Sequence, residues 1–97
     1  MPTYISLLSW TEAGVKTYKD TLDRAQAAGD VAASLGGTLK DVYWTVGPYD
    51  VVSVADFPDD ETATAFLLKL GSTGSIRSTT MRAFTRDEMA RVLDKAS

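Results

Sequence analysis

Four residues near the middle of the chain, Gly47-Pro48-Tyr49-Asp50, most strongly limit the fold that it can adopt. They separate two runs rich in β-branched and aromatic residues, 38–46 and 51–57. A Gly-Pro pair is typical of a tight turn. Two parallel strands need a crossover of a dozen or more residues, so a connection this short excludes them. The two runs are therefore predicted to form an antiparallel hairpin.

Each side of this hairpin carries a helix pattern and a further strand pattern. Strands are predicted at residues 3–9 and 75–84. Between the first strand and the hairpin, small or apolar residues recur at alternating spacings of three and four, which is typical of one helix face. These residues are Val15, Tyr18, Leu22, Ala25, Gly29 and Ala32. Ser9 with Glu12 has the spacing of a capping box, Thr11 is a competing cap, and Gly36-Gly37 is predicted to end the helix.

A second helix is predicted after the hairpin, beginning at the acidic residues 59–61 and ending near 71–74. Its apolar face carries Ala63, Phe66, Leu67 and Leu70. Thr85 and Glu88 then form a capping box for a short last helix. Met89, Val92 and Leu93 supply one face of that helix.

The predicted order is therefore βαββαβ followed by a helix, which is the split-βαβ, ferredoxin-like pattern of the α+β class. Right-handed crossovers give an antiparallel sheet with strand order 4-1-3-2 and all helices on one face. With 97 residues, the chain is expected to form one domain over residues 1–97.

The period of two along each strand predicts which side chains meet the helices. The predicted helix side holds Ile5, Leu7, Val42, Trp44, Val46, Val52, Val54, Met81 and Ala83. The opposite face is predicted to hold Ser6, Leu8, Leu39, Asp41, Tyr43, Thr45, Val51, Ser53, Ala55, Phe57, Ser78, Thr80, Arg82 and Phe84. That face is too apolar for bare water, which predicts a second copy packed sheet on sheet. Leu8→Asp or Phe57→Asp is then expected to weaken the assembly.

Composition excludes several functions. Cys, His and Asn are absent, so thiolate chemistry, zinc knuckles and Ser-His-Asp catalysis are ruled out. The net charge is −3 and no basic run occurs, which argues against nucleic-acid binding. No apolar run is long enough to span a membrane and no export signal is recognisable, so a cytoplasmic location is expected. The acidic residues Asp56, Asp59, Asp60 and Glu61 lack the spacing of a cation loop, and no metal or cofactor is expected.

A ligand site is predicted on the uncovered face, built from Tyr43, Ser53, Thr80 and Arg82. The Arg82 guanidinium suits a carboxylate or phosphate, or it pairs with Asp41 or with Asp50 of a neighbouring copy. A wet dimer interface with no ligand is the alternative for this face.

Tyr49 and Asp50 allow two interpretations. A phenol beside a carboxylate could work as an acid–base pair. Alternatively, Asp50 accepts backbone N–H groups at the strand start, and Tyr49 covers the sheet end or contacts a partner. The structural interpretation is favoured.

The sequence around the hairpin resembles the GYD-domain proteins. The run from Val42 to Val52 carries the Gly, Tyr, Asp motif as Gly47, Tyr49 and Asp50. The opening Tyr4-Ile5 with Trp10-Thr11-Glu12, the Gly36-Gly37 pair and the strand from Ile76 to Phe84 are also similar, so the resemblance spans nearly the whole chain. It implies a dimeric α+β barrel and no established activity or catalytic residue.

Two functions of different classes remain open from the sequence. The first is a small homo-oligomeric binding or regulatory protein that holds a small molecule between packed sheets. The second is a cofactor-independent enzyme of the monooxygenase or isomerase type, for which Asp41, Asp50, Asp56 and the tyrosines are the available bases. RNA binding on the same topology is disfavoured, because Phe57 is the one aromatic residue of the third strand and the charge is acidic.

Overall fold

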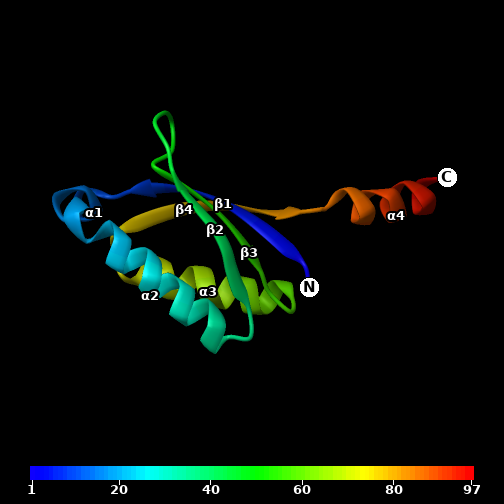
Figure 1. Cartoon of the computed structure of the whole chain (residues 1–97), viewed down its shortest axis with the longest axis horizontal. Coiled ribbons are helices and arrows are strands. Elements are labelled where there is room, and N and C mark those ends of the chain that lie inside the picture. The colour runs from blue at the N-terminus through cyan, green and yellow to red at the C-terminus, as the bar shows by residue number, and fades with distance from the viewer.

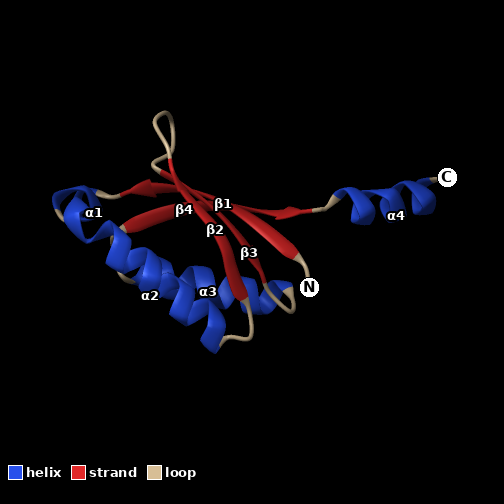
Figure 2. Ribbon diagram, viewed as in Figure 1, coloured by secondary structure: helices blue, strands red, loops and turns tan.

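The computed structural model describes residues 1–97 and contains one four-stranded sheet with helices on one side (Figures 1 and 2). In chain order the elements are β1 (Thr3–Trp10), α1 (Glu12–Lys16), a 3-10 turn η1 (Tyr18–Asp20), α2 (Thr21–Ser34), β2 (Thr38–Trp44), β3 (Val51–Asp56), α3 (Asp60–Ser72), β4 (Ile76–Ala83) and α4 (Arg86–Ala96).

The sheet has the order β2-β3-β1-β4, and every neighbouring pair of strands is antiparallel. This is the predicted 4-1-3-2 order read from the other edge, and it confirms the ferredoxin-like α+β fold. Figure 1 shows α2 and α3 lying along one face of the sheet, whereas α4 extends beyond the end of β4. The prediction that all helices lie on one face was therefore wrong for α4. The hairpin between β2 and β3 is the connection that the sequence predicted.

The first helical region is divided. Thr11, not Ser9, caps it: the Thr11 side chain accepts a hydrogen bond from the backbone N–H of Gly14. The short α1 is separated from α2 by the 3-10 turn, so the apolar series does not continue as one face. Val15 and Leu22 of that series are exposed, whereas Ala32 in α2 is fully buried. The prediction of a single face from residue 15 onward was therefore wrong in its first half.

The later helix predictions are confirmed. Gly36 has φ of +78° at the end of α2, a conformation that favours glycine. The face of α3 packs on the core through Ala63 and Phe66. At the start of α4, Thr85 and Glu88 form both hydrogen bonds of the capping box.

The predicted assignment of sheet faces was wrong for β1, β3 and β4. Cross-strand register places Tyr4, Ser6 and Leu8 on the helix side, opposite residues of even number in β4 and of odd number in β3. The buried residues Tyr4, Ala55, Phe57, Ala32, Ala63 and Phe66 form the core. Ala55 and Ser53 are small, so the helices can approach the sheet closely at these positions. The alternation pattern alone could not choose between two faces that both carry apolar residues.

In β2 a register shift between Leu39 and Asp41 changes which residues share a face. Leu39 lies on the helix side together with Val42 and Trp44, and all three line the same cavity. The prediction for Val42 and Trp44 was right, and the prediction for Leu39 was wrong because the bulge adds one residue. The prediction for Val46 was also wrong, because β2 ends at Trp44 and Val46 is fully exposed beyond it.

The uncovered face is still strongly apolar. It carries Ile5, Leu7, Tyr43, Val52, Val54 and Met81, none of which a helix covers. Leu8 and Phe57 instead lie in the interior, where Phe57 is 1% exposed. A charge at either position would therefore unfold the protein, which corrects the expectation that they form the interface between copies.

Gly14 is required where α1 crosses the start of β4. A Cβ at Gly14 would overlap the backbone carbonyl oxygen of Ser75. We expect Gly14→Ala to lower the free energy of unfolding by about 1–3 kcal/mol, because the backbone must shift to relieve the overlap. Gly71→Ala in α3 is the matched control, since a Cβ there meets nothing within 4 Å. In a urea titration followed by circular dichroism, Gly71→Ala should have the wild-type free energy of unfolding or a slightly higher one. Equal stability of the two variants would contradict the close approach of Gly14 to Ser75.

Candidate functional site

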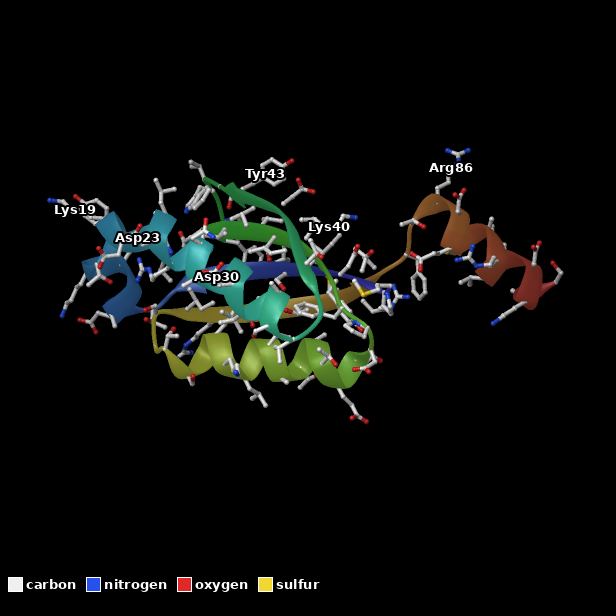
Figure 3. All side chains as sticks on the ribbon, turned by 60° about the horizontal axis from the view of Figure 1, so that its bottom comes forward. Lys19, Asp23, Asp30, Lys40, Tyr43 and Arg86 are labelled. Atoms are coloured by element: carbon white, nitrogen blue, oxygen red, sulfur yellow. The ribbon has the colours of Figure 1, made fainter.

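The four residues of the predicted ligand site do not share one face. Ser53, Thr80 and Arg82 project toward the helix side of the sheet. Tyr43 lies on the uncovered face with 60% of its surface exposed, and Figure 3 shows it projecting away from α3. The Oγ1 of Thr80 lies 2.7 Å from the Oγ of Ser6. The structure therefore separates Tyr43 from the other three residues.

Arg82 is partnered within its own chain. Its Nη2 lies 3.5 Å from Glu88 Oε2 at the first turn of α4, and its guanidinium carbon lies 4.5 Å from the centre of the Phe84 ring. The pKa of the Glu88 carboxyl is lowered, first by the hydrogen bond from the Thr85 backbone N–H and further by Arg82. Within the chain, the ion-pair partner of Arg82 is therefore Glu88 and not the predicted Asp41. These contacts connect the end of β4 to α4.

Asp50 joins the hairpin to the end of β1. Its Oδ2 accepts a hydrogen bond of 2.9 Å from the backbone N–H of Trp10, beyond the point where the β1–β3 pairing ends at Leu8 and Val51. Its own backbone N–H donates to the carbonyl of Leu8 over 2.8 Å. Asp50 thus satisfies a strand N–H that the ladder leaves free, as the structural interpretation of this residue predicted.

The neighbouring residues complete the turn. The Thr45 hydroxyl donates to the carbonyl oxygen of Tyr49 over 2.6 Å, and the Thr45 backbone N–H donates to the carbonyl of Asp50 over 2.9 Å. Gly47 has φ of +150°, at the margin of the region that glycine favours. Gly47 and Asp50 therefore serve the hairpin geometry, and Tyr49 contributes its backbone carbonyl.

We expect Asp50→Ala to lower the free energy of unfolding by about 1–3 kcal/mol, because the Trp10 N–H loses its partner. For a domain of this size the melting temperature should fall by several degrees. Asp50→Asn is the matched control. Its amide oxygen can still accept the hydrogen bond, so this variant should keep most of the stability that Asp50→Ala loses. A melting temperature and a mass that are both unchanged in Asp50→Ala would instead favour a catalytic role for this carboxylate.

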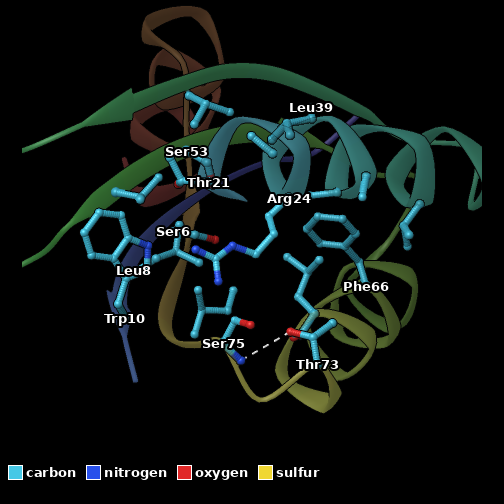
Figure 4. A pocket seen from close by; sticks show the side chains of 18 of the residues that line it. Ser6, Leu8, Trp10, Thr21, Arg24, Leu39, Ser53, Phe66, Thr73 and Ser75 are labelled. Carbon is cyan, nitrogen blue, oxygen red and sulfur yellow. Dashed lines mark hydrogen bonds between the residues drawn. The ribbon is translucent and has the colours of Figure 1, made fainter. Parts of the chain in front are cut away.

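A cavity of about 200 Å³ lies on the helix side of the sheet, between the strands and the helices α2 and α3 (Figure 4). It is partly open to solvent. Its lining residues are Ser6, Leu8, Trp10, Thr21, Arg24, Ala25, Ala27, Ala28, Val31, Leu39, Val42, Trp44, Val51, Ser53, Phe66, Lys69, Leu70, Thr73, Ser75 and Ile76. Of the predicted ligand residues, Ser53 alone belongs to this lining.

The sequence analysis missed this cavity because it placed the helices on the other face. One signal was present: three alanines of α2 face a serine of β3, and short side chains leave space where a well-packed core would have none. The size of the cavity depends on where α2 and α3 lie above the sheet, and the spacing of residues along the chain does not specify those positions.

Tyr4 lies at the other end of the core. Its ring is buried against Phe57, and its hydroxyl donates to the carboxylate of Asp60 at the start of α3. Burial, which disfavours the phenolate, is the main cause that raises the pKa of Tyr4 to about 12, and the Asp60 charge adds to it. This phenol is therefore a neutral hydrogen-bond donor over the physiological range.

The raised pKa of Tyr4 predicts a loss of stability in alkali. The phenol ionises near pH 10 when unfolded and near 12 when folded, so its contribution is complete below pH 10 and is lost as the pH rises through 12. We expect thermal melts of the wild type to fall over this interval, with Tyr4→Phe showing a smaller fall. Tyr43→Phe on the uncovered face is the control and should keep the wild-type profile. Identical profiles for Tyr4→Phe and the wild type would contradict the shift.

Two further findings concern the whole chain. No helix combines the length and the apolar character that crossing a membrane requires. No group of three or more acidic side chains is placed so that it could hold a metal ion.

The family model of the GYD domain matches residues 4–93, nearly the whole chain. The chain belongs to the GYD-domain family. A relative from Thermus thermophilus, the glutamine synthetase and cystathionine beta-lyase binding protein, is 31% identical over 94 residues, which cover 95% of this chain and 99% of the relative. The predicted resemblance is thereby confirmed.

Solved structures agree on the fold of this GYD domain. A crystal structure of a Thermus thermophilus protein matches with a TM-score of 0.57 and 26% identity, over 88% of this chain and 95% of that chain. A feast or famine regulatory protein from M. tuberculosis, solved with L-methionine, matches with a TM-score of 0.67 and 9% identity, over 88% of this chain and 51% of that one. At 9% identity the second likeness concerns the fold alone.

Proposed function

We propose that this GYD domain is a small binding protein that self-associates through the uncovered face of its sheet and acts on other proteins by binding them. The observation that carries the proposal is the apolar character of that face. Large exposed apolar patches on a folded protein mark contact sites, because leaving them in water is unfavourable.

The composition of the face supports a second copy as its occupant. Ile5, Leu7, Val52 and Val54 occupy the two central strands, so the patch is continuous and central. Tyr43 and Met81 extend it onto the outer strands. A two-fold axis would pack this patch against the same patch of another copy, and each copy would bury the other's central strands.

The last helix gives independent support. α4 reaches beyond the sheet, and its apolar stripe of Met89, Val92 and Leu93 is exposed together with Phe84. Within one chain, no helix or strand packs extensively against α4. A second copy placed against the sheet face would have surface within reach of this arm and could cover the stripe.

Binding fits the site better than catalysis does. Asp50 accepts a backbone N–H, Asp56 accepts the Thr3 hydroxyl and pairs with Lys40, and Tyr4 is held neutral by burial. None of these groups is left as a free base in a cleft, which an acid–base enzyme requires. The Thermus thermophilus relative is named for binding glutamine synthetase and cystathionine beta-lyase, which supports enzymes as the partner class.

We expect Val54→Asp to shift the solution mass from oligomer toward monomer, measured by light scattering across a dilution series. The dissociation constant should rise more than about tenfold, since each dimer would bury two unpaired carboxylates. Leu68→Asp is the matched control, because Leu68 is 70% exposed on α3, away from the sheet face. Circular dichroism establishes that both variants are folded.

Two outcomes would overturn the proposal. A wild-type protein that is monomeric at every concentration would show that the sheet face does not self-associate. If Leu68→Asp dissociated the oligomer and Val54→Asp did not, the interface would lie on the helix layer and not on the sheet face.

A further inference from the structure

We propose that the cavity between the sheet and the helices α2 and α3 binds a small organic carboxylate with an apolar or aromatic body, and that Arg24 receives the carboxylate. The inference is independent of self-association, because the cavity lies on the opposite side of the sheet from the uncovered face. It rests on the volume of the cavity, the charges in its lining, the anchoring of Arg24 and the two indoles of its wall.

The volume suits one small molecule. An apolar cavity of about 150 Å³ holds a benzene molecule. The cavity here measures about 200 Å³, and thirteen of its twenty lining residues are hydrophobic. It therefore accommodates a single ring or a short branched chain with a small polar group.

The charges of the lining specify the sign of that polar group. Arg24 and Lys69 are the charged residues of the lining, and it contains no Asp or Glu. This is unexpected in a chain that carries 13 acidic and 10 basic residues. A cationic site with apolar walls favours an anion that brings its own apolar surface.

Arg24 is anchored but not neutralised. Its Nη1 donates to the Thr17 hydroxyl over 3.0 Å, and its Nη2 donates to the backbone carbonyls of Gly14 and Thr17 over 3.2 Å and 3.0 Å. The three ion pairs of the chain do not include it. A guanidinium has five N–H donors, so these three bonds leave donors free for a carboxylate.

The walls around Arg24 are suited to an apolar body. Figure 4 shows the Arg24 side chain directed into the cavity, on the side where Ser6 and Trp10 lie. Trp44 closes the β2 side, and its indole N–H donates to the Thr21 hydroxyl over 2.9 Å, which holds the ring in place. Two indoles and an anchored guanidinium therefore line the same cavity, a combination that suits a ligand with both a ring and an acid.

Tryptophan fluorescence provides the measurement, because both tryptophans of the chain, Trp10 and Trp44, line the cavity. The probes are phenylacetate, 3-phenylpropionate and hexanoate, each paired with its neutral amide. Acetate is the control for a carboxylate that has no ring or apolar chain. We expect saturable fluorescence changes with the carboxylates and binding of at least about tenfold lower affinity with the amides, because an Arg–carboxylate bond is charge-assisted. Acetate should give no change, because it has no apolar body to fill the cavity.

Variants localise the binding. Arg24→Gln should weaken phenylacetate binding by about ten- to a hundredfold. Arg86→Gln makes the same change of charge at the start of α4, far from the cavity, and should bind as the wild type does (Figure 3). Because Arg24 also links α1 to α2, Ala28→Leu serves as a second test: it fills the cavity while keeping the guanidinium, and it should abolish binding.

Each alternative result is decisive. Carboxylates that bind no more tightly than their amides would overturn the role of Arg24, as would wild-type affinity in a folded Arg24→Gln. Unchanged binding in Ala28→Leu would place the ligand outside the cavity. No fluorescence response to any of the three carboxylates, confirmed by calorimetry, would overturn the proposal as a whole.

Discussion

The packing of Phe57 beneath the helices sets the architecture of this protein. Its ring lies against Phe66 of α3, with centroids 4.9 Å apart, and against Tyr4 of β1. It also fills the space beside Gly37, where a Cβ would overlap the ring. One aromatic side chain thus joins the end of β3, the return from α2 and the middle of α3, and it determines which face of the sheet the helices cover.

Once that face is fixed, the chain has two surfaces with different consequences. The helix side has small residues at its centre, and the alanines of α2 together with Ser53 leave a cavity that no side chain of the chain fills. The other side has larger aliphatic residues, Ile5, Leu7, Val52 and Val54, with nothing above them. The first surface offers space for a small molecule and the second offers contact area for a protein. A domain of this size can therefore carry two separate binding functions on the two sides of a single sheet.

The hairpin motif after which the family is named stabilises the fold through backbone hydrogen bonds, and no catalytic role of its residues is needed to explain it. The Asp50 carboxylate accepts a hydrogen bond from the Trp10 N–H, and that bond fixes the end of β1 beyond its pairing with β3. Trp10 in turn forms part of the cavity wall. The motif therefore supports the cavity through the backbone of β1, although none of the three motif residues lines it. This arrangement gives a physical reason for the glycine and the aspartate of the motif that requires no reaction.

The sequence by itself determined the element order, the hairpin, the caps and the strand order, because these depend on neighbours along the chain and on the handedness of crossovers. Thr85 with Glu88, Gly36 at the end of α2, and Asp50 at the strand start were all predictable from local backbone needs. The tertiary structure decided which face of the sheet is covered, since β1 and β3 carry apolar residues at both parities and only packing against Phe66 distinguishes them. It also decided the bulge that turns Leu39 inward, the pairing of Arg82 with Glu88, and the cavity around Arg24. The bulge and the ion pair depend on strand register and on where α4 begins in space. The cavity depends on how close the helices come to the sheet, a distance set by the summed volumes of residues far apart in the chain.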